Sequence, residues 1–201
     1  MVELVRKKEV EQNWLVRHSA SLKTTFRVIF GLVWLVDGSL KFTPGLVTKF
    51  PGLVTTAGQG QPAWLHPWFS FWAAQAAAHP AFWVYTTGTL ELALAFCLIV
   101  GFLRKIAYLG GILLSLLIWA VPEGFGGPYG PGATDLGTGI VYALLFLALI
   151  VLNASFGPSR WSLDYYLEER WPRWGVVAEF QKLVPPEDNE SLPVEKDATA
   201  A

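Results

Sequence analysis

The sequence predicts an all-α membrane protein: a bundle of four transmembrane helices, with an interfacial helix in the first outer loop and an amphipathic helix near the C-terminus. Three observations support this fold class. Hydrophobic residues make up 53% of the 201 residues and charged residues only 15%, whereas an average globular chain is about 25% charged. Four apolar stretches approach the length needed to cross a bilayer core of about 30 Å. Lysine and arginine are concentrated in segments that share one side of such a bundle.

The first apolar stretch, 22–42, decides how the chain enters the membrane. It follows a polar and basic segment, 1–21, as the hydrophobic part of a signal peptide does, but a signal peptide ends in a small-residue cleavage site. This stretch ends instead in Asp37-Gly-Ser-Leu-Lys41, so we interpret it as a retained span. The remaining predicted spans, which complete a transmembrane domain over 22–155, are 81–102, 106–121 and 134–152.

The segment between the first two spans has the composition of surface structure. Glycine and proline punctuate 43–80, which we therefore expect to be a loop. Within it, Trp64, Trp68 and Trp72 repeat every four residues. Because tryptophan favours the headgroup level of a bilayer, this repeat predicts a short interfacial helix inside the loop.

The distribution of basic residues sets the expected orientation. Of the 15 lysines and arginines, all but Lys41 and Lys49 lie in the N-terminal part of the chain, between the second and third spans, or after the fourth. Positively charged segments stay in the cytoplasm, so both termini of this multi-pass protein are expected there. The C-terminal region is then a cytoplasmic amphipathic segment, 156–184, with a surface helix near 160–174, followed by a disordered tail, 185–201.

Three carboxylates interrupt the apolar stretches and are the candidate catalytic residues: Asp37, Glu91 and Asp135. A charge at the bilayer centre costs about 2.5–3.5 kcal/mol on insertion scales, so it usually has a function or a partner. Glu91 is near mid-depth in its span, and we predict that it handles protons beside a redox ligand. Pairing with Arg27 is the structural alternative for Glu91. For Asp37, pairing with Lys41 one turn later is expected, and interfacial solvation with helix capping remains open for both outer acids.

The candidate ligand-binding residues are mostly aromatic. They are Trp34, Lys41, Trp83, Trp119 and Tyr142. Aromatic residues at helical spacing also pack cores and form interfacial belts, so this alternative stays open. The sequence contains no metal-binding quartet, haem-attachment motif or glycine-rich dinucleotide loop. A single cysteine, Cys97, excludes a disulfide within the chain, and no basic block suggests a nucleic-acid partner.

Three segments resemble the DoxX/DoxD-like family of small four-span membrane proteins. They are RVIFGLVWLVDGSLKF at 27–42, GTLELALAF at 88–96 and GPYGPGATDLGTGIVY at 127–142. The last segment most resembles the DoxD branch, the large membrane subunit of thiosulfate:quinone oxidoreductase. The resemblance implies a prokaryotic plasma-membrane protein of sulfur metabolism that passes electrons from thiosulfate to a membrane quinone, together with a small partner subunit. The competing hypothesis is a non-catalytic membrane scaffold that recruits a soluble redox enzyme.

Overall fold

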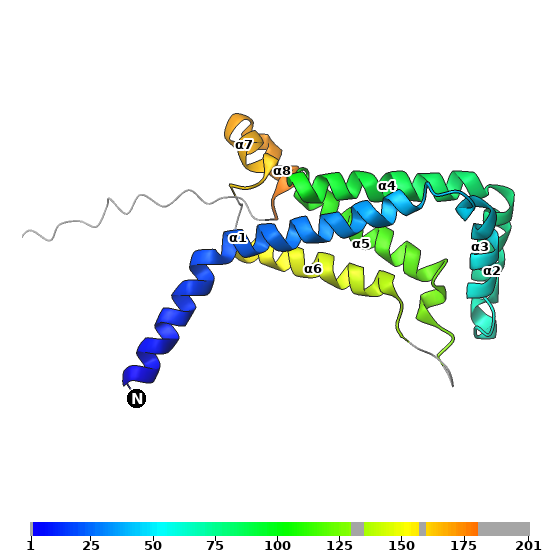
Figure 1. Ribbon diagram of the computed structural model, residues 1–201, viewed down its shortest axis with the longest axis horizontal. Helices are drawn as coiled ribbons and strands as arrows, with labels where there is room; N and C mark the ends of the chain where they lie inside the picture. The colour runs from blue at the N-terminus through cyan, green and yellow to red at the C-terminus, as the bar shows by residue number, and fades with distance from the viewer. Residues whose placement is uncertain (1, 130–134, 157–159, 181–201) are drawn as a thin grey trace, which may run out of the picture.

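The computed structural model describes residues 2–129, 135–156 and 160–180, and all regular secondary structure in these ranges is helical. Four long helices lie side by side along the long axis of the molecule (Figure 1). They are α1 (Val2–Leu40), α4 (Pro80–Val100), α5 (Arg104–Ala120) and α6 (Thr138–Phe156). The shorter helices are α2 (Leu46–Ala57), α3 (His66–Ala78), α7 (Leu163–Arg170) and α8 (Gly175–Ala178). Helices α2 and α3 cross one end of the bundle, here named the Lys41 end, and α7 and α8 lie at the other, the Arg104 end.

Three helical segments are long and apolar enough to cross a membrane. They are His18–Leu40 in α1, Pro80–Val100, which is α4, and Thr138–Ser155 in α6. Large apolar side chains project outward from them, and Val36, Phe96 and Leu144 are each more than half exposed. Apolar surface of this extent fits contact with lipid rather than with water. The predicted all-helical class is therefore confirmed in the described residues, and these three segments indicate a membrane protein.

Some helix boundaries differ from those that the sequence predicts. Helix α1 begins at Val2, so the basic N-terminal segment continues the first helix, and Figure 1 shows it extending beyond the bundle. Helix α6 begins at Thr138 rather than at 134. Thr134, the first residue of the predicted fourth span, lies outside the described residues, as does the predicted tail, 185–201.

The loop predicted after the first span is largely helical. Residues 46–57 form α2 although Pro51 and Gly52 lie inside it. A proline removes one helical hydrogen bond, but α2 packs against α3 and α4, and Val54 on its packed face is wholly buried. This tertiary burial outweighs the local preference of two residues. A helix is present at 66–78, as α3, where the tryptophan repeat predicts one.

Small residues bring α1 and α4 close together and fix their register. A Cβ added to Gly38 would lie 3.0 Å from the side chain of Leu92, and one added to Gly88 would lie 2.7 Å from the Cβ of Lys41. Close approach through small residues is the usual way in which helices pack within a membrane. The register places Glu91 level with the last turn of α1, although Glu91 lies near the middle of α4.

The contact between α5 and α6 gives a direct test of this packing. A Cβ at Gly111 would lie 2.3 Å from the ring of Phe146, and that ring has no exposed surface, so it has little room to move. We expect Gly111→Ala to destabilise the protein by about 1–3 kcal/mol, the usual range for overpacking. The measurement is thermal unfolding in detergent. Gly110→Ala is the matched control, because its Cβ meets nothing within 4 Å; equal losses in both variants would contradict the packing.

Candidate functional site

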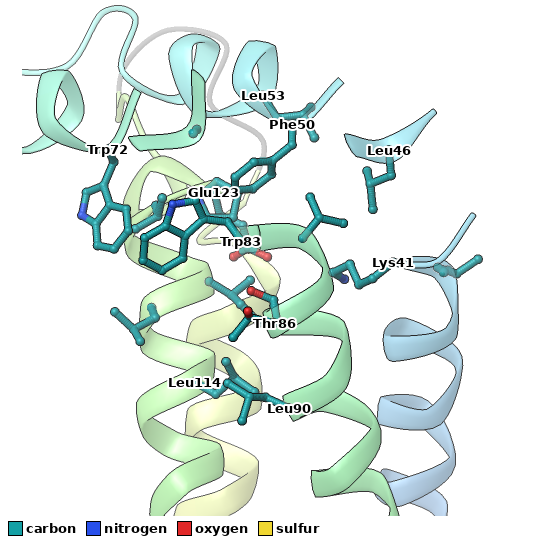
Figure 2. A pocket seen from close by; sticks show the side chains of 18 of the residues that line it. Lys41, Leu46, Phe50, Leu53, Trp72, Trp83, Thr86, Leu90, Leu114 and Glu123 are labelled. Atoms are coloured by element: carbon teal, nitrogen blue, oxygen red, sulfur yellow. The ribbon is translucent and has the colours of Figure 1, made fainter. Parts of the chain in front are cut away.

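An apolar cavity of about 520 Å³ lies at the Lys41 end of the bundle. Figure 2 shows Phe50 and Leu53 extending over it from α2, and Leu90 and Leu114 below them on the long helices α4 and α5. Most of the side chains that line the cavity are apolar. The polar groups of the wall belong to Lys41, Glu123, three threonines and two tryptophans. The cavity therefore offers a few polar groups within an apolar enclosure, as ligand sites usually do.

Lys41 is the basic residue of the cavity wall. It follows the last residue of α1, and Figure 2 shows its side chain pointing from the end of that helix toward α4. Its Nζ lies 3.2 Å from a carboxylate oxygen of Glu91 and 3.5 Å from the backbone oxygen of Asp37. The Glu91 side chain is 1% exposed and that of Lys41 is 29% exposed. Glu91 is thus a buried counter-charge that holds Lys41 in place at the edge of the cavity.

The structure forms neither of the two ion pairs that the sequence suggests. The carboxylate of Asp37 does not meet Lys41, because the ammonium group of Lys41 turns toward Glu91. Arg27 does not reach Glu91, since it lies at the Arg104 end and its Nη2 donates to the backbone oxygen of Trp161 at 2.7 Å. The close register of α1 and α4 explains both results, because it puts Glu91 beside the end of α1 that carries Lys41.

Asp37 faces the bundle core instead. The hydroxyl group of Tyr142, on α6, donates to the Asp37 carboxylate at 3.2 Å. The ring of Tyr142 packs against Trp34 with centroids 5.4 Å apart, and Trp34 belongs to the buried core. The structure therefore brings these three sequence-predicted residues together, but none of them lines the cavity.

Two tryptophans of the cavity wall have buried indole N–H groups with no hydrogen-bond partner among the described residues. They are Trp72 of α3 and Trp83 of α4, whose rings pack edge to face with centroids 5.2 Å apart. An unsatisfied buried donor costs about 1–3 kcal/mol, so such groups commonly bind a water molecule or a ligand. Trp83 is a sequence-predicted site residue. The sequence places Trp72 only in an interfacial helix, because its packing against α4 has no local signal.

Glu123, Trp119 and Asp135 organise the connection that leads into α6. The carboxylate of Glu123 lines the cavity and accepts the backbone N–H of Gly139 at 2.8 Å, where a negative charge stabilises the start of a helix. The indole N–H of Trp119 donates to a backbone oxygen of the connection at 2.7 Å. Exposed Asp135 accepts the N–H of Gly137 at 2.8 Å. Trp119 and Asp135 therefore have structural contacts here, and neither lines the cavity.

The cavity suits an amphiphile with a hydrogen-bonding head. Four of its lining residues, Leu40, Leu53, Leu90 and Leu117, are each about half exposed. Its mouth is therefore bordered by the apolar flank of the molecule, through which a lipid-soluble compound can enter. Inside, the Lys41 ammonium and the indole N–H groups are donors for a carbonyl or phenolic oxygen. Within the part of the chain that the structure describes, no group of three or more potential metal ligands is found.

A second buried cluster, at the Arg104 end, is not predicted by the sequence. The guanidinium of Arg104 is buried among three carboxylates, those of Asp164, Glu168 and Glu179. Its Nε lies 3.0 Å from Asp164, and its Nη2 lies 3.4 Å from Glu168. Asp164 also accepts the backbone N–H groups of Leu103 and Arg104, both at 2.9 Å. One aspartate thus caps the start of α5 and pairs with its first side chain.

This cluster fastens residues 160–180 to the connection between α4 and α5. The backbone N–H of Asp164 donates to the oxygen of Gly101 at 3.1 Å, and the indole of Trp174 donates to the Asp164 carboxylate at 2.9 Å. The sequence carries one local signal, since Ser162 before an acidic first turn marks the start of α7. That signal locates a helix but does not identify a partner on a distant part of the chain.

The carboxylates around Arg104 make the docking of residues 160–180 depend on pH. Burial, reinforced by Glu179, raises the pKa of Glu168 from its ordinary value of 4.5 to about 7, although Arg104 acts in the opposite direction. Burial also raises the pKa of Glu179, against Arg104 and Lys23. A raised pKa means that the docked state of residues 160–180 binds more protons than the detached state. Protonation of Glu168 therefore stabilises docking fully below about pH 4.5, and this stabilisation is lost as the pH rises through about 7.

We therefore expect amide protection factors in residues 160–180 to fall with rising pH over that window, by up to about tenfold per pH unit for one proton. Hydrogen exchange measured by mass spectrometry gives these factors. Glu168→Gln should remove the part of the dependence that Glu168 contributes and leave that of Glu179. Glu169→Gln, on the exposed neighbouring residue, should retain all of it. A dependence that survives Glu168→Gln unchanged would show that another group is responsible.

Together, the fold and the cavity characterise an α-helical membrane protein with an apolar chamber whose polar end is the Lys41–Glu91 pair. In comparisons with known proteins, the chain matches no family model, no curated protein and no solved structure.

Proposed function

We propose that the chain is the membrane subunit of a thiosulfate:quinone oxidoreductase-like system, and that a membrane quinone binds in the cavity at the Lys41 end as the electron acceptor. The observation that carries the proposal is an apolar cavity, open on the apolar flank of the molecule, whose wall holds a lysine fixed by a buried glutamate. The resemblance of three segments to the DoxX/DoxD-like family supports a small sulfur compound as the electron donor.

A quinone matches the chemistry of this cavity. Its ring carbonyls accept hydrogen bonds, so the ring belongs near Lys41 and the unpartnered N–H of Trp83. Its isoprenoid tail is apolar and belongs among the half-exposed leucines at the mouth. A volume of about 520 Å³ lies within the range of about 300–1,000 Å³ that is usual for sites binding small molecules.

The overall reaction sets what the site must supply. Two thiosulfate ions lose two electrons and join through a new sulfur–sulfur bond, and one quinone gains those two electrons and two protons to become a quinol. Lys41 is placed to hydrogen-bond a quinone oxygen and to give it one proton. Glu91 holds the Lys41 ammonium in position through their ion pair. The second proton comes from water, and Glu123, the other ionisable residue of the wall, is placed to relay it. The sulfur half-reaction belongs to the complex with the small partner subunit.

The proposed arrangement in the membrane has four spans. The fourth is α5, whose 17 residues cover about 26 Å at about 1.5 Å per residue, near the lower limit for a bilayer core. The Arg104 end carries most of the basic residues and faces the cytoplasm together with both termini. The cavity then lies toward the outer leaflet of the plasma membrane.

This topology predicts different labelling of two cysteines. In a Cys97→Ser background, a cysteine at Gln59, between α2 and α3, should react with an impermeant thiol reagent in intact cells. A cysteine at Glu169, on α7, should react only after lysis. Both native side chains are exposed, so accessibility within the fold does not bias the comparison. Reaction of both positions before lysis would contradict the four-span arrangement with cytoplasmic termini.

The proposed activity is tested with the purified protein, alone and together with its co-purified partner subunit. Thiosulfate-dependent reduction of a short-chain quinone is followed by absorbance. We expect the complex to reduce the quinone and variants of Lys41 to lose most of this activity. A scaffold that only recruits a soluble redox enzyme predicts instead that reduction follows the soluble enzyme and is unaffected by changes at Lys41.

A further inference from the structure

In the C-terminal segment, 160–180, most of the acidic side chains are largely buried and most of the exposed charged side chains are basic. Its acids Asp164, Glu168 and Glu179 are turned toward the buried guanidinium of Arg104. Its exposed charged residues are Arg160, Glu169, Arg170 and Arg173. Because three of the four acids of this segment pair with Arg104, its exposed charged residues are mainly basic.

Large aromatic and apolar side chains are exposed on the same segment. Trp161 is 73% exposed, Tyr166 is 59%, Trp171 is 58% and Val176 is 67%. Tryptophan and tyrosine favour the headgroup level of a bilayer. Helical segments with exposed aromatic and basic residues bind at the surface of membranes that contain anionic lipid.

The segment is fixed at the level where a bilayer surface is expected. Asp164 is hydrogen-bonded to Gly101 and Leu103, which connect α4 to α5. The segment therefore begins where an apolar helix long enough to cross a membrane ends. Figure 1 shows α7 projecting to the side of the bundle rather than continuing along its axis. In the proposed four-span arrangement, a helix at the side of the bundle lies over the surrounding lipid.

We propose that residues 160–180 form a platform that binds anionic phospholipid headgroups at the membrane surface. The exposed arginines contact the phosphate groups, and the exposed tryptophans lie among the headgroups. A lipid surface is favoured over a protein partner because the platform continues from apolar, membrane-spanning surface and because its exposed charge is mainly of one sign. Arg104 contributes indirectly, by holding three acids away from that surface. This inference is independent of the quinone chemistry.

The test uses the full chain with Cys97→Ser and Tyr166→Cys, carrying a polarity-sensitive fluorophore at position 166. The protein is placed in nanodiscs of phosphatidylcholine alone, or of phosphatidylcholine mixed with phosphatidylglycerol. We expect the emission to shift to the blue in the anionic discs and to return toward the aqueous value at high salt. A basic residue near an anionic surface contributes about 1 kcal/mol, or about fivefold. Arg170→Gln/Arg173→Gln should therefore weaken the docking equilibrium by about 30-fold.

Lys49→Gln, which changes an exposed residue of α2 at the opposite end, is the matched control and should leave the shift unchanged. An aqueous emission in both kinds of disc would overturn the proposal. So would an equal blue shift in both discs that ignores salt, because the contact would then be apolar only. A salt titration of the labelled protein with Arg170 and Arg173 intact distinguishes these outcomes without the arginine variants.

Discussion

Lys41→Met is expected to lower thiosulfate-dependent quinone turnover by about 10–100-fold, the equivalent of one hydrogen bond from a charged donor. It also leaves the Glu91 carboxylate, which is 1% exposed, without its counter-charge. Removing one member of a buried pair costs about 3–5 kcal/mol. We expect a smaller cost here, because Lys41 keeps 29% of its side chain exposed. Steady-state kinetics and thermal unfolding measure the two effects separately.

The double variant Lys41→Met/Glu91→Gln separates a binding role from a packing role. Without the buried charge, the double variant should recover most of the lost stability, so that the two changes are strongly non-additive. Turnover should stay low, because the donor at the edge of the cavity is still missing. Lys49→Met, which changes an exposed residue of α2 that does not line the cavity, is the control for loss of a lysine. Recovery of turnover together with stability would mean that the pair only packs α1 against α4.

Arg104→Met is expected to release the whole C-terminal platform. The substitution leaves Asp164, which has no exposed surface, and Glu179 without their shared cation. By the same comparison with buried ion pairs, the expected cost is about 3–5 kcal/mol. Because the broken contacts join residues 160–180 to the start of α5, we expect local detachment rather than unfolding of the bundle. Limited proteolysis of the segment and amide exchange at Asp164 report this directly.

Two further variants test whether the charge of Arg104 holds residues 160–180 in place. Arg173→Met changes an exposed arginine on the same segment and should have little effect on protease sensitivity. Arg104→Lys retains the charge but loses the fork that reaches several carboxylates at once, so it should give an intermediate result. Protection of residues 160–180 that is unchanged in Arg104→Met would contradict the structural role of the cluster.

The long helices are predictable from the sequence because their signal is local and dense. Apolar runs predict α4, α5 and most of α6, with boundaries a few residues from those observed. Helix α2 is missed because Pro51 and Gly52 are strong local breakers, while the burial of Val54 against other helices is visible only in three dimensions. The apolar spacing of Leu46, Phe50 and Leu53 is a signal for this helix, and the two breakers outweigh it in a local reading.

The sequence draws attention to the charged residues at the Lys41 end but does not identify their partners. Glu91 and Lys41 are both selected as charges in apolar surroundings, and the structure pairs them with each other. The sequence suggests different partners for each, because helical spacing within one segment is visible in a sequence and the register between two segments is not. The same reason separates Trp34 and Tyr142, which face the core, from Trp83, which faces the cavity.

Photolabelling tests whether a quinone binds beside Lys41. A quinone with a photoreactive headgroup is irradiated with the reconstituted protein, and the labelled peptides are identified by mass spectrometry. We predict labelling near Lys41 and Trp83, competition by excess unmodified quinone, and loss of labelling in Lys41→Met/Glu91→Gln. Labelling that is confined to other surfaces, or that persists unchanged in the double variant, would contradict quinone binding there.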